Sequence, residues 1–280
     1  MDDRACLAFG LSGMWPIGHS AFGHSDRRVL VNVIWDMGGT LIDTYTPLNE
    51  VFYSLVHRAA VRDGDRAAQD FDPARVAALT HTSISFAMDE IARQTTVTRH
   101  ELSDAYEKLK VSWKDQPAPL MPHARDVLAA VKRMGGLNLV VTHRDRESAQ
   151  TLLREHRLDV DDMVCVSDGF ARKPDPGMFL EVIRRHGLHS TEIMSVGDRL
   201  IDVQASHAAG VRAALIVPEG LDSGVHGLDS ARLRDSGRQK SGGQDSAVGQ
   251  ELPQRDAPEW IVRGLGDLLD PGYPLGRAVA

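Results

Sequence analysis

Three carboxylates, one hydroxyl and one ammonium group stand at or just beyond short apolar segments of this chain. They belong to Asp36, Asp198, Asp202, Thr142 and Lys173. The apolar runs that precede the aspartates and the threonine are expected to be buried parallel strands, and open α/β sheets bind ligands at the carboxyl ends of such strands. Lys173 precedes Pro174, which biases its backbone toward an extended conformation. Because core packing requires none of these polar groups there, we expect them to share one site.

The chemistry of this set fits phosphoryl transfer. A carboxylate such as Asp36 can attack phosphorus and carry the phosphoryl group covalently, which divides one displacement into two easier steps. Mg²⁺ takes one or two carboxylates together with waters and phosphate oxygens. Asp36 and Asp198 suit that role, with Asp202 ordering the waters of the metal. Thr142 and Lys173 would bind the phosphoryl oxygens and offset their charge in the transition state.

The order of these residues resembles the haloacid dehalogenase superfamily, in the subgroup that carries a helical cap inserted after the first motif (phosphoglycolate phosphatases and β-phosphoglucomutase). The resemblance covers roughly residues 29–217. It implies that Asp36 is the nucleophile, that Thr142 and Lys173 are the second and third motifs, and that the fourth is acidic. The implied Mg²⁺ ligands are Asp36, the backbone carbonyl of Gly38, Asp198 and Asp202, and the implied substrate contacts are Gly39, Thr142, His143 and Lys173.

Gly38 departs from the pattern, because phosphatases of this superfamily usually carry a second aspartate at this position. That aspartate protonates the leaving oxygen, and general acid–base help of this kind contributes about 10²–10⁴-fold. Dehalogenase members also lack it, but they use no metal and do not need the acidic pair Asp198 and Asp202. Phosphonate-cleaving members use a Schiff-base lysine from the early cap, and residues 44–107 contain no lysine.

Two alternatives therefore stay open at this stage. The chain is a phosphatase whose acid is impaired or relocated, or it is a catalytically weak protein that binds phosphorylated ligands. His143 is the candidate for a relocated acid, because histidine titrates in the useful pH range. The favoured interpretation is that His143 only forms hydrogen bonds in its loop.

Composition narrows the range of partners and locations. The chain has 280 residues and a net charge of −7, from 39 acidic and 32 basic residues, so it presents no general basic field for nucleic acid. Its two cysteines, Cys6 and Cys165, give no disulfide framework. Cys165 is expected to be a buried thiol, and the chain to be cytoplasmic. No segment reaches the roughly 18 apolar residues of a membrane span. A small phosphorylated molecule is the expected partner, without nucleic acid or membrane.

The chain divides into four kinds of segment. Residues 1–28 are expected to be a disordered extension rather than a signal peptide, since they begin with Asp2 and Asp3 and their apolar run is interrupted by glycine and proline. Residues 29–45, 120–217 and 258–272 are predicted to form a doubly wound, parallel, Rossmann-like α/β core. Residues 46–119 are predicted to be a helical cap, and residues 218–257 a low-complexity insertion.

Two local signals support helices in the predicted cap. Asp72 and Pro73 are typical of a helix start, and Thr98 with Glu101 fits a capping box. The cap also carries arginines that could contact substrate, although a solvated helix face is the favoured interpretation for each. These arginines include Arg58, Arg62, Arg75 and Arg93.

Overall fold

A six-stranded parallel sheet forms the core of the chain. The computed structural model describes residues 32–218 and 257–276, and the predictions for residues 1–28 and 219–256 lie outside these ranges. The strands are β1 (Asn32–Trp35), β2 (Asn138–Thr142), β3 (Asp162–Cys165), β4 (Ile193–Gly197), β5 (Arg212–Ile216) and β6 (Trp260–Val262). Their order is β3-β2-β1-β4-β5-β6, and every neighbouring pair is parallel. The predicted doubly wound α/β fold is confirmed.

Helices cover both faces of this sheet, and for that reason its central strands consist almost entirely of apolar residues. Val33 and Trp35 of β1 face one apolar cluster, while Ile34 faces the other. The first face is covered by α6 (Ala124–Arg133), α7 (Arg146–Glu155) and the 3₁₀ helix η4 (Leu265–Leu269), and the second by α8 (Gly177–His186) and α9 (Leu200–Ala208). Short 3₁₀ turns η1 (Val166–Asp168) and η2 (Ser190–Glu192) complete the connections. Cys165 at the end of β3 is fully buried, as predicted.

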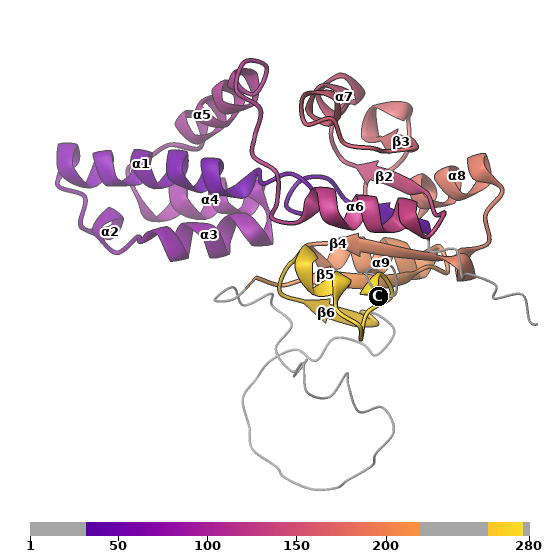
Figure 1. Cartoon of the computed structure of the whole chain (residues 1–280). Helices are drawn as coiled ribbons and strands as arrows, with labels where there is room; N and C mark the ends of the chain where they lie inside the picture. Colours follow the sequence, from indigo (N-terminus) through magenta and orange to yellow (C-terminus); the bar gives the residue numbers. More distant parts are fainter. Residues whose placement is uncertain (1–31, 219–256, 277–280) are drawn as a thin grey trace, which may run out of the picture.

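Five helices lie between β1 and α6 and stand to one side of the sheet (Figure 1). They are α1 (Tyr45–Asp63), α2 (Arg66–Gln69), α3 (Pro73–Thr82), α4 (Ile84–Gln94) and α5 (Arg99–Ser112). They enclose an apolar cluster of their own, with Phe52, Ile91 and Leu102 fully buried. Asp72 caps α3 and Thr98 forms a capping box with Glu101 at α5, so both helix-start predictions are confirmed.

The two chain segments that connect these helices to the core run beside each other. The Asp43 amide donates to the carbonyl of Pro119 at 2.7 Å, and the Met121 amide donates to the carbonyl of Leu41 at 3.0 Å. Ile42 and Leu120 pair as an antiparallel bridge. The polypeptide therefore leaves the core and re-enters it at one place.

Among residues 32–218 and 257–276, the helices are too short or too polar to cross a bilayer.

Candidate active site

Asp36 and Asp198 follow neighbouring strands at the carboxyl edge of the sheet. Asp36 comes directly after β1, and Asp198 directly after β4. The chain adds β2 and β3 on one side of β1 and then crosses to place β4 on the other side, so a topological switch point lies between β1 and β4. Ligands of open α/β sheets bind at such points.

Lys173 forms ion pairs with two of the aspartates, Asp36 and Asp202. Its Nζ lies 2.5 Å from Asp36 Oδ1 and 2.7 Å from Asp202 Oδ1, and its side chain is fully buried. Burial alone would lower the pKa of Lys173, but the charges of Asp202 and Asp36 outweigh it and raise that pKa. Burial raises the pKa of Asp36, and the ammonium of Lys173 opposes the shift. The lysine thus provides the positive charge that two buried carboxylates require.

Two glycines leave space for the aspartates. Gly39 has a φ of +90°, and a Cβ there would lie 2.6 Å from Asp198 Oδ2. A Cβ on Gly197 would lie 2.4 Å from the Cβ of Asp202. Both distances are shorter than real contacts, so any larger residue would displace a carboxylate of the site.

The surroundings of Asp198 fit a divalent cation. Asp198 Oδ1 accepts a hydrogen bond from the Thr40 hydroxyl at 3.3 Å, whereas the buried Oδ2 has no hydrogen-bond partner. Burial and the nearby charges of Asp36 and Asp202 raise the pKa of Asp198 to about 8. Within the described residues, the carbonyl of Gly38 accepts no hydrogen bond from the backbone amides of turns and loops. These groups are oxygen ligands with unsatisfied capacity, which Mg²⁺ prefers.

Asp202 is placed differently from these two aspartates. Its Oδ1 accepts from Lys173 Nζ, and its Oδ2 accepts from the backbone amide of Arg199 at 3.1 Å. Although burial alone would raise the pKa of Asp202, the charges of Lys173 and Arg199 lower it. The described residues contain no cluster of three or more His, Cys, Asp or Glu side chains arranged to hold a metal. A metal held by Asp36, Asp198 and the Gly38 carbonyl, with Asp202 outside the direct ligands, agrees with this geometry.

We expect the Asp198→Asn variant to bind Mg²⁺ at least about tenfold more weakly than the wild type, because a neutral amide replaces an anionic ligand. Isothermal titration calorimetry measures this affinity directly. Asp126→Asn, a change at an exposed carboxylate of α6, serves as the control. Equal Mg²⁺ affinity in Asp198→Asn and the wild type would place the metal elsewhere.

Thr142 and His143 form the loop after β2. Thr142 Oγ1 accepts from the backbone amide of Arg144 at 3.2 Å, which leaves the hydroxyl proton free to be donated to a ligand. His143 Nε2 accepts from the backbone amide of Lys173 at 2.8 Å. Burial and the charges of Lys173 and Arg199 lower the pKa of His143 to about 4. His143 is therefore neutral at pH 7 and holds the Lys173 segment, in line with the favoured hydrogen-bonding interpretation.

A cavity of about 520 Å³ opens above these groups, between the core and the inserted helices. Its walls include the predicted residues Asp36, Gly38, Thr142 and His143. They also include residues that sequence reasoning missed: Thr44, Tyr45, Ile84, Tyr106, Lys110, Arg144, Asp145, Ser148, Val166, Arg172 and Arg199.

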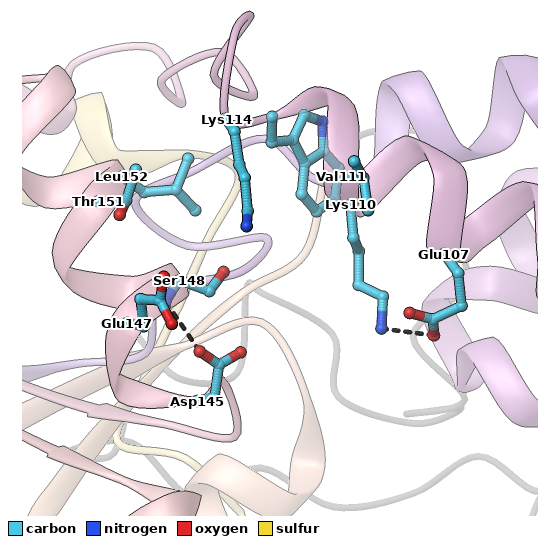
Figure 2. Close-up of a pocket in the computed structure, with 10 residues that line it drawn as sticks. Glu107, Lys110, Val111, Lys114, Asp145, Glu147, Ser148, Thr151 and Leu152 are labelled. Atoms are coloured by element: carbon cyan, nitrogen blue, oxygen red, sulfur yellow. Dashed lines mark hydrogen bonds and ion pairs between the residues drawn. The ribbon is translucent and has the colours of Figure 1, made fainter.

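A groove between α5 and α7 adjoins this cavity and shares Lys110, Asp145 and Ser148 with it. Figure 2 shows Lys110 directed to Glu107, its ion-pair partner at 2.6 Å. In the same view Asp145 accepts from the Ser148 amide, at 2.8 Å, and so caps α7. Lys110 and Glu107 thus neutralise each other, while Asp145 is held by the amide of its own helix.

Some of the missed residues carried a signal in the sequence. Arg144 and Arg199 are cations within two positions of Thr142 and Asp198, so adjacency to the motifs could have identified them. Tyr45 begins α1 and Lys110 lies in α5, and neither carried such a signal. Two of the cap arginines behave as solvated residues: Arg62 and Arg93 are 65% and 68% exposed in ion pairs with Asp63 and Glu90. Arg75 instead stacks on the Phe71 ring and donates to the Asp70 carbonyl. None of Arg58, Arg62, Arg75 and Arg93 lines the cavity.

A family model for haloacid dehalogenase-like hydrolases matches residues 33–216, which include every strand-end residue described above. The chain belongs to this family. Membership of the haloacid dehalogenase-like hydrolases explains why the sheet, the inserted helices and the order of Asp36, Thr142, Lys173 and Asp198 occur together in this chain.

Curated relatives of this haloacid dehalogenase-like chain include two phosphatases. A phosphoglycolate phosphatase of Yersinia pestis is 25% identical over 188 residues, covering 65% of this chain and 79% of the relative. An N-acetylmuramic acid 6-phosphate phosphatase of Pseudomonas aeruginosa is 24% identical over 196 residues, covering 68% and 83%. The crystal structure of a HAD family hydrolase from Deinococcus radiodurans, with bound phosphate and sodium, shares the fold: its TM-score is 0.61 at 15% identity, covering 88% of this chain and 96% of that one.

Proposed function

We propose that this chain is a Mg²⁺-dependent phosphatase of small phosphorylated metabolites, with Asp36 as the nucleophile. The observation that carries the proposal is the buried cluster of Asp36, Lys173, Asp202 and Asp198, of which Asp36 lines the cavity. Such a cluster has no role in core packing and matches the requirements of phosphoryl transfer. The two curated relatives, both named as phosphatases, support the same reaction.

In this mechanism Asp36 attacks phosphorus, the bond from phosphorus to the leaving oxygen breaks, and an aspartyl-phosphate forms. Lys173 and the Thr142 hydroxyl bind the phosphoryl oxygens, and His143 holds Lys173 in position through its backbone amide. Water then attacks the phosphorus and releases Asp36 and inorganic phosphate. Bound Mg²⁺ would supply charge compensation between the aspartates and the phosphoryl group.

We also propose that the substrate carries a second anionic group. The molecules named by the two relatives, phosphoglycolate and N-acetylmuramic acid 6-phosphate, are both acids as well as phosphates. In this chain the guanidinium of Arg144 lines the cavity, 4.9 Å from the ring of Trp113, and its Nη1 donates to Ser148 at 3.1 Å. Among the described residues no carboxylate forms an ion pair with Arg144. A partly buried guanidinium without a carboxylate partner is stabilised by binding an anionic ligand.

We expect Arg144→Met to raise the KM for phosphoglycolate by roughly 10- to 150-fold, the range for loss of one charge-assisted hydrogen bond. The KM for ethyl phosphate, which lacks the second charge, should change far less. Steady-state phosphate release measures both values. Arg154→Met, at a 70% exposed arginine of α7, is the matched control. Equal increases for both substrates would mean that Arg144 does not read a second anion.

The second candidate function is binding of phosphorylated ligands by the same fold, without catalysis. The observation that favours it is Gly38, which has no side chain to act as the general acid. Phosphate release from acetyl phosphate separates the two. Acetate is a good leaving group that needs no proton, so a phosphatase without its acid still hydrolyses this substrate. Binding of phosphate without any hydrolysis of acetyl phosphate would favour the binding protein.

A further inference from the structure

Arg199 follows Asp198 directly in the chain and is a cation that the mechanism above does not use. It stands between β4 and α9, directly after Asp198, and its backbone amide donates to Asp202 Oδ2 at 3.1 Å. Its side chain lines the cavity beside Asp36 and Gly38. Its Nε is buried and has no hydrogen-bond partner. Among the described residues no carboxylate forms an ion pair with its guanidinium.

The charges around Arg199 place it between the core and the inserted helices. It interacts electrostatically with Asp36, Asp198 and Asp202 of the core, and with Tyr45 of α1. It also lowers the pKa of His81 at the end of α3, in addition to the effect of burial. Arg199 thus lines the cavity together with Asp36 of the core and Tyr45 of α1, and its charge acts on groups of both.

The leaving group must occupy this same side. In phosphoryl transfer the attacking and leaving oxygens are roughly in line with phosphorus. Because Asp36 attacks from the floor of the cavity, the leaving oxygen points away from the floor, toward Tyr45 and the other inserted residues. This is the side on which Gly38 offers no side chain.

We propose that Arg199 stabilises the negative charge that develops on the leaving oxygen, in place of the carboxylic acid that is absent at Gly38. This inference rests on the proposed phosphatase function. The Asp36–phosphorus bond forms while the bond to the leaving oxygen breaks, and the electron pair stays on that oxygen. An arginine keeps its proton in proteins, so Arg199 acts by charge and hydrogen bonding, and the departing alkoxide takes its proton from water.

The contribution of Arg199 to the rate should therefore depend on the leaving group of the substrate. In the Mg²⁺-loaded full-length protein, we expect Arg199→Met to reduce kcat/KM for ethyl phosphate by about 10³-fold, the lower end of the range for a transition-state arginine. For acetyl phosphate, whose leaving group is already stable, the reduction should be about tenfold or less. For a series of aryl phosphates, the reduction in kcat/KM should lie between these two values and increase with the pKa of the leaving group. Arg93→Met, at a 68% exposed cap arginine, is the matched control.

A chemical rescue and two further variants distinguish a catalytic role of Arg199 from a structural one. Guanidinium ion at tens of millimolar should partly restore ethyl phosphate hydrolysis by Arg199→Met and have no such effect on the wild type. Adding Gly38→Asp to Arg199→Met should restore ethyl phosphate hydrolysis more than acetyl phosphate hydrolysis. If Arg199→Met melts at a much lower temperature, Arg199→Lys carries the comparison: it keeps the charge, so its leaving-group dependence should be intermediate.

The outcomes distinguish this inference from the function on which it rests. A uniform reduction across all leaving groups, without rescue by guanidinium, would overturn the role of Arg199 while leaving the phosphatase intact. Wild-type protein that releases phosphate from neither acetyl phosphate nor ethyl phosphate would overturn the phosphatase function and this inference together.

Discussion

Replacing Asp36 by Asn should reduce phosphate release from acetyl phosphate and p-nitrophenyl phosphate by about 10⁴-fold or more, which is the scale seen when a covalent nucleophile is removed. Asn keeps the shape of the side chain and can still accept a hydrogen bond from Lys173, but it loses the charge that attacks phosphorus. Rapid acid quenching of the wild type with acetyl phosphate should also yield a protein heavier by one phosphoryl group, and this adduct should be absent from Asp36→Asn.

The control for this experiment is Asp159→Asn, at a carboxylate that is 74% exposed. Thermal melting of both variants separates loss of chemistry from loss of folding. Phosphate release by Asp36→Asn at a rate near that of the wild type would show that Asp36 is not the nucleophile, and the phosphatase mechanism proposed above would then be wrong.

Introducing the missing acid, by Gly38→Asp, should speed the hydrolysis of ethyl phosphate more than that of acetyl phosphate. The structure accepts a Cβ at this position if the Thr44 side chain shifts by a few tenths of an ångström. A Cβ on Gly38 would meet only the Thr44 side chain, with Oγ1 at 3.2 Å, and Gly38 does not have a positive φ. The ceiling is about 10²–10⁴-fold for general acid catalysis. Arg199 lines the same cavity and would favour the ionised form of the new carboxyl group, so we expect the lower part of that range in the otherwise wild-type protein.

Gly38→Ala is the matched control, because it adds the Cβ without the carboxyl group. The decisive measurement is the ratio of kcat/KM for ethyl phosphate to that for acetyl phosphate in Gly38→Asp, Gly38→Ala and the wild type. If Gly38→Asp slows both substrates while the wild type already hydrolyses ethyl phosphate well, another group supplies the proton. His143→Ala would then be the next variant, although the lowered pKa of His143 argues against that role.

The arrangement of the core was predictable because it depends on local patterns. Apolar runs that end in a polar residue predicted β1, β2 and β4, and parallel strands bring such ends to one edge of the sheet. The sequence alone therefore predicts that Asp36, Thr142 and Asp198 lie at the same edge of the sheet. The helix-start patterns at Asp72 and Thr98 were equally local, and both were found in the structure.

The rest of the site depends on contacts that no local pattern encodes. Lys173 lies in the loop before α8 and meets Asp36 and Asp202, which are 137 and 29 positions away in the chain. The second contact occupies the Oδ1 atom of Asp202. Tyr45 lines the cavity because of how the inserted helices dock on the core. Arg199 was adjacent to a recognised motif, but only the structure shows that its Nε is buried and unpaired.

The paired entry and exit of the inserted helices has a consequence for how this protein could diversify. Because Ile42 and Leu120 are bridged to each other, the segment between them leaves and re-enters the core at one place. It has an apolar cluster of its own, although Tyr106, Leu109 and Trp113 also pack on the core. Exchanging or resizing that segment leaves the ends of β1, β2 and β4 where they are. Changes in that segment would therefore reshape the part of the cavity wall formed by Tyr45, Tyr106 and Lys110, while Arg144 and the strand-end residues keep their places in the core.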